Sequence, residues 1–274
     1  MPLNSCLLRI RQQPSKLFKQ SLGLVAVPGG SDQPGPICHS LQEEFPLYQT
    51  VSRQTLEALK KIDSPSICNA IEGFNIRPKN QGFMLPEIQC VFRDTTPVVG
   101  YAVTGVIAAN QPEGRTVGRE QWWDLILSVP EPRFIVLHDI DNPPLGAYWG
   151  EVQSNIHKAL GAVGVATDGT VRDLDEVHAL GFQFFAKHVS VSHAYVHLVE
   201  IGIPITMGGL TVRTGDLLHG DKHGVTNIPF EIADKIPGMV KTIADYERKT
   251  IDLCQSSGFT VEKLKEVAKI TRPY

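Results

Sequence analysis

The chain has 274 residues, of which 42% are hydrophobic and 20% charged, and its formal net charge is −3. This length allows one large domain or two small ones and needs no disulfide or structural metal to fold. The near balance of 26 basic and 29 acidic residues argues against bulk nucleic-acid binding, which requires a strong basic excess. No apolar run approaches the roughly 18 residues of a membrane span, so we expect a soluble globular protein without a membrane partner.

Residues 1–47 differ in composition from the rest of the chain. Residues 1–31 carry four basic residues and no acidic one, and residues 24–48 are rich in Pro, Gly and Ser. A basic leader is compatible with mitochondrial targeting, but Pro14 interrupts any helix there. We therefore prefer a disordered extension or a misplaced start codon, followed by a linker, and expect a cytoplasmic protein whose folded domain begins at residue 48.

The cysteine pattern indicates a reduced intracellular compartment. The number of cysteines is odd, and their wide spacing includes no C-x-x-C pair that would suggest a zinc site. We interpret Cys68 and Cys90 as small buried hydrophobic residues and not as nucleophiles. The five positions are Cys6 and Cys38, then Cys68 and Cys90, and finally Cys254.

Two short helices are predicted at the start of the domain. Ser52 is a suitable N-cap for a helix with Leu56 and Leu59 on one face. The sequence Asp-Ser-Pro at 63–65 opens a second helix through residue 71, with Pro65 at its first position.

Strand-like and helical segments alternate from residue 97 onward. The expected order is strand 98–107, helix 121–128, strand 134–137, helix 152–160 and strand 164–167. Gly161 ends the second of these helices, and the turn Asp168-Gly169 is expected to end the last strand. Strand, helix and strand in that order predict a right-handed βαβ unit with a parallel pair.

The rest of the chain is predicted as antiparallel hairpins followed by helices. Short strands are expected at 182–186, 189–191, 196–199, 203–207, 211–212 and 216–219. Helices follow at 235–255 and at 260–269, the latter with Thr260 as N-cap. The expected fold class is one mixed α/β domain with a parallel βαβ core, an antiparallel β layer and helices at both ends.

Two motifs carry the most chemistry: GEVQ at 150–153 and DGTVRD at 168–173. Ligands of open α/β sheets gather outside the carboxyl ends of parallel strands, and helix-opening amides there form an anion site. Arg172 would suit a carboxylate, Asp173 a hard cation such as Mg²⁺, and Glu151 a proton transfer. From the residues alone, an Arg–Asp pair after an Asp-Gly turn is more often a surface ion pair than a binding site.

Other segments support a family resemblance. SPSICNA at 64–70 precedes the two motifs, and GLTVRTGD at 209–216, DKHGV at 221–225 and Pro229 follow them. This ordered set, over roughly residues 50–235, resembles the RraA-like family, which contains the regulator of ribonuclease activity A and the 4-hydroxy-4-methyl-2-oxoglutarate aldolases. The resemblance implies three segments: a leader and linker at 1–47, the family domain at 48–235 and C-terminal helices at 236–274.

The resemblance also implies a fold, an assembly and a site. The fold would be a swivelling β/β/α three-layer domain, assembled as a homotrimer or a dimer of trimers. In the aldolase members a divalent metal cation, Mg²⁺ or Mn²⁺, holds the enolate of pyruvate, and the same enolate arises when oxaloacetate is decarboxylated. By motif, Asp173 would be the metal ligand and Glu151 and Arg172 would be catalytic. The substrate would be held by Gly150, Glu151, Val152, Gln153 and Arg172.

Two positions depart from the family pattern. Glu151 stands where the aldolases usually carry Asp, and Asn69 replaces an acidic residue that is common in the opening helix. The extra methylene of Glu151 moves its carboxylate by about a bond length, and misplacements near 1 Å can lower a rate by about 10²-fold. The metal and carboxylate pocket is expected to remain, whereas the substrate is left open.

The remaining motifs give weaker signals. His188, His193 and His197 cannot all face one side of a strand, so a shared metal is not expected. HGDKH at 219–223 is interpreted as a hairpin turn, and Trp122 and Trp123 as one core residue and one interface or pocket wall. No glycine-rich phosphate loop supports nucleotide binding.

The leading hypothesis is a divalent-metal-dependent lyase that cleaves a 4-hydroxy-2-oxo acid, such as 4-hydroxy-4-methyl-2-oxoglutarate, to pyruvate. The alternatives are a non-catalytic protein-binding regulator of ribonuclease activity and a related hydro-lyase or decarboxylase. Retention of Arg172, Asp173 and an acid at 151 favours the enzyme, because a regulator needs no complete pocket. The expected partners are a small 2-oxo acid and other copies of the chain.

Overall fold

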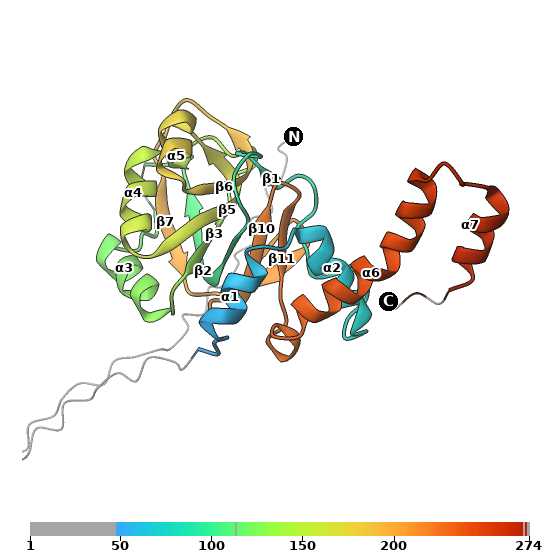
Figure 1. Cartoon of the computed structure of the whole chain (residues 1–274). Coiled ribbons are helices and arrows are strands. Elements are labelled where there is room, and N and C mark those ends of the chain that lie inside the picture. The colour runs from blue at the N-terminus through green and yellow to red at the C-terminus, as the bar shows by residue number, and fades with distance from the viewer. Residues whose placement is uncertain (1–47, 113, 271, 273–274) are drawn as a thin grey trace, which may run out of the picture. The chain divides into compact units, whose positions relative to one another are not determined.

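The structure is a computed structural model that describes residues 48–112, 114–270 and 272 (Figure 1). The leader prediction, with Cys6 and Cys38, lies outside the described residues. The helices are α1 (Arg53–Leu59), α2 (Ser64–Gly73), α3 (Arg119–Ser128), α4 (Glu151–Ala159), α5 (Leu174–Leu180), α6 (Ile236–Gln255) and α7 (Val261–Ala268), with a 3₁₀ turn at Phe230–Ile232.

A mixed sheet organises the domain, with strand order β1-β6-β5-β3-β2-β10-β11 and with β4 and β7 paired to β5 and β2. Strands β8 and β9 form a separate antiparallel hairpin. The strands are β1 (Gln89–Cys90), β2 (Val98–Ala108), β3 (Arg133–Asp139), β4 (Ala147–Trp149), β5 (Ala162–Val171), β6 (Gln183–Val189), β7 (His197–Ile201), β8 (Ile205–Met207), β9 (Leu210–Val212), β10 (Leu217–Asp221) and β11 (Gly224–Asn227).

The predicted parallel βαβ core is confirmed. Strands β2, β3 and β5 are parallel neighbours, and α4 lies in the connection between β3 and β5. The predicted antiparallel pairs β8–β9 and β10–β11 are also present. The mixed α/β fold class expected from the sequence is therefore correct.

Two details of this region were predicted wrongly. Strand β5 does not end at Asp168-Gly169, because the ladder with β6 shifts register between Thr167 and Thr170 and then continues. The Thr167 Oγ1 accepts the Gly169 N–H at 3.0 Å within this irregularity. Strand β6 pairs parallel to β5 and does not form a hairpin with it. The helix α5, which was not predicted, connects the end of β5 to the beginning of β6 at the opposite end of the strands.

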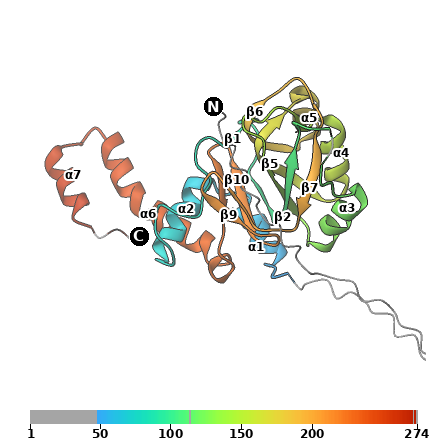
Figure 2. The same cartoon turned by 180° about the vertical axis from the view of Figure 1, so that it is seen from behind.

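The two faces of the sheet are covered by different layers, because successive strand residues point to opposite sides. On one side, Val103 and Ile135 pack with helix residues such as Trp122. On the other, Phe134 and Phe185 pack with the β8–β9 hairpin and with residues 84–90. Figure 2 shows α3, α4 and α5 together beside the sheet, seen from behind.

The end helices begin where the capping residues predict. Ser52 Oγ accepts the Thr55 N–H at 3.0 Å, and Thr260 Oγ1 accepts the Lys263 N–H at 3.2 Å. Asp63 caps α2, so Ser64 is the first helical residue and Pro65 the second, one position later than predicted. None of the helices that the structure describes has the length and apolar character needed to cross a membrane.

Candidate functional site

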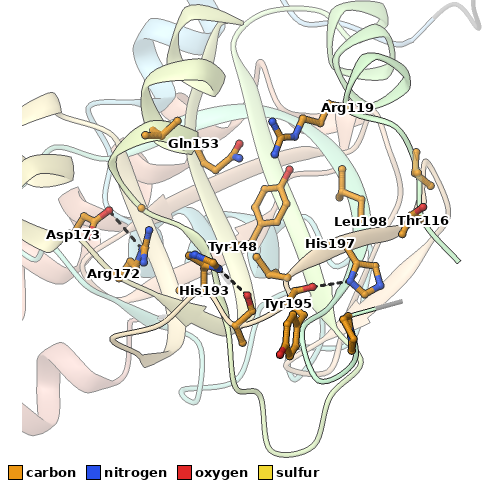
Figure 3. Close-up of a pocket in the computed structure, with 17 residues that line it drawn as sticks. Thr116, Arg119, Tyr148, Gln153, Arg172, Asp173, His193, Tyr195, His197 and Leu198 are labelled. Atoms are coloured by element: carbon orange, nitrogen blue, oxygen red, sulfur yellow. Dashed lines mark hydrogen bonds and ion pairs between the residues drawn. The ribbon is translucent and has the colours of Figure 1, made fainter. Parts of the chain in front are cut away.

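A pocket of about 550 Å³ lies where β2, β4 and β5 end, which is the side of an α/β sheet where ligands bind. Its walls come from the loop before α3, the β4–α4 junction, the residues after β5 and the segment that enters β7 (Figure 3). The lining includes four of the predicted substrate residues and the predicted metal ligand, namely Gly150, Val152, Gln153, Arg172 and Asp173.

Asp173 joins the two motifs at the pocket. Its Oδ2 accepts the backbone N–H of Glu151 at 2.9 Å, so the carboxylate lies at the N-terminus of α4. Arg172 Nε is 3.7 Å from the same oxygen, and the Arg172 N–H donates to the Trp149 carbonyl at 2.9 Å. These contacts fix the RD motif against the start of the GEVQ motif.

The contact between Asp173 and the start of α4 depends on the backbone conformation of Asp173 and on the missing side chain of Gly150. Asp173 has φ 55 and ψ 50, in the left-handed region that Asp tolerates better than most non-glycine residues. Opposite it, a Cβ on Gly150 would lie 2.3 Å from Asp173 Oδ2 and 3.2 Å from Arg172 Nε. Only glycine leaves room for the carboxylate, so position 150 is sterically coupled to position 173.

The donor set around Asp173 fits a divalent cation that keeps most of its water. Asp173 Oδ1 has no hydrogen bond within the described part of the chain, and the side chain is 36% exposed. Mg²⁺ is often held by one or two carboxylates, with water and substrate oxygens completing its shell. Over residues 48–112, 114–270 and 272, no group of three or more His, Cys, Asp or Glu side chains is arranged as a metal site.

The helix-opening residues are only partly available to a ligand. The Glu151 N–H is taken by Asp173, while the Val152 and Gln153 amides belong to the first turn, whose N–H groups lack intrahelical acceptors. The Glu151 side chain is exposed and is not among the pocket-lining residues. The structure thus brings together the other five predicted site residues and leaves the Glu151 carboxylate at the rim of the α4 terminus.

The buried side chain of His157 connects helix α4 to helix α3. His157 Nδ1 donates to the Gln153 carbonyl at 2.7 Å, and His157 Nε2 accepts the Trp122 Nε1–H at 2.8 Å. This pair of bonds requires the neutral ring, since the cation would direct a second N–H at an N–H donor. Burial lowers the pKa of His157 to about 4, which agrees with this tautomer. Of the two tryptophans, one of which was expected to be a core residue, Trp122 is the buried one, and its hydrogen bond connects α3 to α4.

Sequence reasoning missed polar pocket residues such as Arg119, which opens α3, and Tyr148, which lies on β4. It did predict Gln153, but for its backbone amide and not for its side chain. Burial raises the pKa of Tyr148 to about 12, despite the nearby Arg119 cation, so the hydroxyl stays protonated at neutral pH. Two sequence signals could have found these residues. Tyr148 and Gln153 lie next to or within the GEVQ motif, and Arg119 is at the start of a helix that follows a parallel strand.

The other sequence candidates have different surroundings. His193 and His197 line the pocket wall, with their Nδ1 atoms bonded to the carbonyls of Ala194 and Tyr195. The HGDKH segment forms the end of β10 and the turn into β11, so the predicted hairpin is present, but its first three residues are part of the strand. Burial raises the pKa of the Cys90 thiol to about 11, which makes it a poor nucleophile at neutral pH.

Comparison with known proteins identifies relatives of this domain. The model of the family RraA-like, described as "Aldolase/RraA", matches residues 64–226. An uncharacterized protein of Methanocaldococcus jannaschii is 29% identical over 74% of this chain and 90% of its own length. A protein of Halalkalibacterium halodurans named "Putative 4-hydroxy-4-methyl-2-oxoglutarate aldolase" is 32% identical, over 36% of this chain and 47% of its own length.

A solved structure shares the fold. RraAS2 of Streptomyces coelicolor, described as an unusual member of the RNase ES inhibitor RraA protein family, superposes with a TM-score of 0.59 at 19% identity. The match covers 74% of this chain and 98% of the other. With the family model matching residues 64–226 of 274, the chain belongs to the RraA-like family.

Proposed function

We propose that this chain is a divalent-metal-dependent lyase that cleaves a 4-hydroxy-2-oxo acid, such as 4-hydroxy-4-methyl-2-oxoglutarate, to pyruvate. The observation that carries the proposal is the contact of Asp173 Oδ2 with the Glu151 N–H beside Arg172, in a pocket of about 550 Å³. A relative named as a candidate aldolase of this substrate lends support. Decarboxylation of oxaloacetate is the expected side activity.

The pocket residues divide the binding work between them. Arg172 and the free amides of Val152 and Gln153 would bind the C1 carboxylate, because guanidinium and helix-opening N–H groups both favour an anion. Asp173 would hold the divalent cation through its free oxygen. When bound, Mg²⁺ or Mn²⁺ supplies Lewis-acid stabilisation for the negative charge that develops as the C3–C4 bond breaks.

A proton must leave the 4-hydroxyl and a proton must reach C3 of pyruvate in this cleavage. Glu151 is the exposed carboxylate next to the pocket, at the first residue of α4. Because its side chain does not line the pocket, we assign it the exchange of a proton with a bound water and not direct contact with substrate. The homotrimer or dimer of trimers and the cytoplasmic location stay predictions.

Metal removal tests the proposal. Purified protein is supplied with Mg²⁺ or Mn²⁺ and either oxaloacetate or 4-hydroxy-4-methyl-2-oxoglutarate, and pyruvate release is followed with and without EDTA. We expect release that EDTA abolishes and that added Mg²⁺ restores. Release of equal rate in EDTA would contradict a metal-dependent lyase. No release from either substrate, together with tight binding of a ribonuclease, would establish the regulator instead.

A further inference from the structure

The pocket has a second polar end, away from Asp173. Arg119, Tyr148 and Gln153 line it from three different elements, α3, β4 and α4. Figure 3 shows the Arg119 guanidinium and the Gln153 amide directed toward the hydroxyl end of Tyr148. Residues that are 34 positions apart in sequence (Arg119 to Gln153) thus converge on one region of the pocket wall.

These three side chains have no polar partner among the residues that the structure describes. Arg119 takes no part in the neighbouring ion pairs, Arg115–Glu200 and Arg172–Asp173, and it makes no side-chain hydrogen bond. The Tyr148 hydroxyl and the Gln153 amide likewise have no hydrogen bond in this part of the chain. Hydrogen-bonding capacity that the fold leaves unused is therefore concentrated at one end of the pocket.

The chemistry of this end favours an anion. A guanidinium offers only donors, a protonated phenol can donate, and the side-chain amide offers an NH₂ group. Among the lining residues within the described part of the chain, the formal charges are those of Arg119, Arg172 and Asp173, so that Arg119 is the described lining charge that lies away from the RD motif. A single cation with two neutral donors matches one carboxylate better than a dianionic phosphate.

We propose that Arg119, Tyr148 and Gln153 form a second subsite that binds the distal carboxylate of a 2-oxo dicarboxylic acid. The inference rests on the proposed function for the position of the C1 carboxylate at Arg172, and it assigns side chains to the second carboxylate, which 4-hydroxy-4-methyl-2-oxoglutarate and oxaloacetate both carry. Arg119 is then the residue that determines specificity. A substrate with an apolar distal end would leave the Arg119 guanidinium without a partner.

Calorimetry with two ligands that are not cleaved separates this inference from the lyase activity. With Mg²⁺ present, 2-oxoglutarate is compared with 2-oxopentanoate, in which a methyl group replaces the distal carboxylate. We expect the wild type to bind 2-oxoglutarate at least about tenfold more tightly, as for one charge-assisted hydrogen bond at an accessible site. In Arg119→Leu this preference should disappear while the affinity for 2-oxopentanoate stays unchanged, and Arg119→Lys should retain part of it.

Arg115→Leu is the matched control, because it removes the same charge four residues earlier in the chain, at a position outside the pocket lining. It should keep the wild-type preference. Arg119 is exposed and makes no hydrogen bond or ion pair within the described residues, so Arg119→Leu should also keep the wild-type melting temperature. A wild type without preference, or a preference that survives in Arg119→Leu, overturns the subsite, as does failure of 2-oxoglutarate to bind.

The pyruvate assay keeps the two proposals distinguishable. An Arg119-dependent preference in a protein that releases no pyruvate supports the subsite and contradicts the lyase. Pyruvate release with no Arg119-dependent preference supports the lyase and overturns the subsite.

Discussion

The indole Nε1–H of Trp122 donates to His157 Nε2 at 2.8 Å, and both side chains are fully buried. This bond connects α3, which carries Arg119, to α4, which carries the GEVQ motif. The position of the pocket walls therefore depends on a neutral, buried histidine.

Acid should weaken this connection. The unfolded chain protonates His157 near its ordinary pKa of 6.5, whereas the folded chain resists protonation down to about 4. Protons therefore favour the unfolded state as the pH falls from 6.5 to 4, and between pH 7 and pH 5 His157 alone should lower the unfolding free energy by about 2 kcal/mol. Urea unfolding of the wild type and of His157→Asn, which does not titrate, measures this contribution. An equal loss in both proteins would contradict it.

Removal of the indole donor should destabilise the fold. Trp122→Phe leaves His157 Nε2 buried without a partner, which we expect to lower the unfolding free energy by about 2 kcal/mol or more. Trp123→Phe is the control, since Trp123 is half-buried and makes no hydrogen bond in the described structure. Urea denaturation should show a smaller change for the control; equal changes would mean that the bond to His157 is not the cause.

The elements with strong local signals could be predicted from the sequence. Ser52 and Thr260 cap their helices through the expected hydroxyl contacts, and the apolar runs of β3 and β5 do form parallel buried strands. Local sequence was enough here, because an N-cap residue and a continuous apolar run are both recognised from neighbouring residues.

The remaining elements depended on tertiary context. Helix α5 has only seven residues, and although Asp173 and Glu176 have the spacing of a helix start, Asp173 was interpreted only as a metal ligand. Without α5, a parallel β6 could not be expected. Asp168-Gly169 suggested a turn, but Thr167 and Thr170 on either side of it pair with β6, so the strand continues through this irregularity. Arg119 and Tyr148 join the pocket only through long-range packing.

Gly150→Ala should separate site geometry from stability. The new Cβ would lie 2.3 Å from Asp173 Oδ2 and must displace the carboxylate, so we expect pyruvate release to fall by about 10²-fold. Gly238→Ala in α6 is the control, because its Cβ would meet no atom within 4 Å. The control should keep its activity and gain up to about 1 kcal/mol of stability. Wild-type activity in Gly150→Ala would refute the steric coupling.

Glu151→Asp tests the departure from the family pattern. The shorter side chain restores the acid that the aldolases usually carry, so kcat/KM for 4-hydroxy-4-methyl-2-oxoglutarate should rise. Glu176→Asp, at an exposed first-turn position of α5, should change nothing. A fall in kcat/KM for Glu151→Asp would mean that Glu151 is adapted to a different substrate.

Asp173 carries the central claim, and its replacement tests that claim most directly. Asp173→Asn keeps an oxygen that can accept the Glu151 N–H but removes the charge that would hold the cation. With Mg²⁺ and oxaloacetate, we expect pyruvate release by Asp173→Asn to fall by at least about 10²-fold, while Asp175→Asn, exposed in the first turn of α5, keeps the wild-type rate. Pyruvate release by Asp173→Asn at the wild-type rate would contradict the metal-dependent lyase.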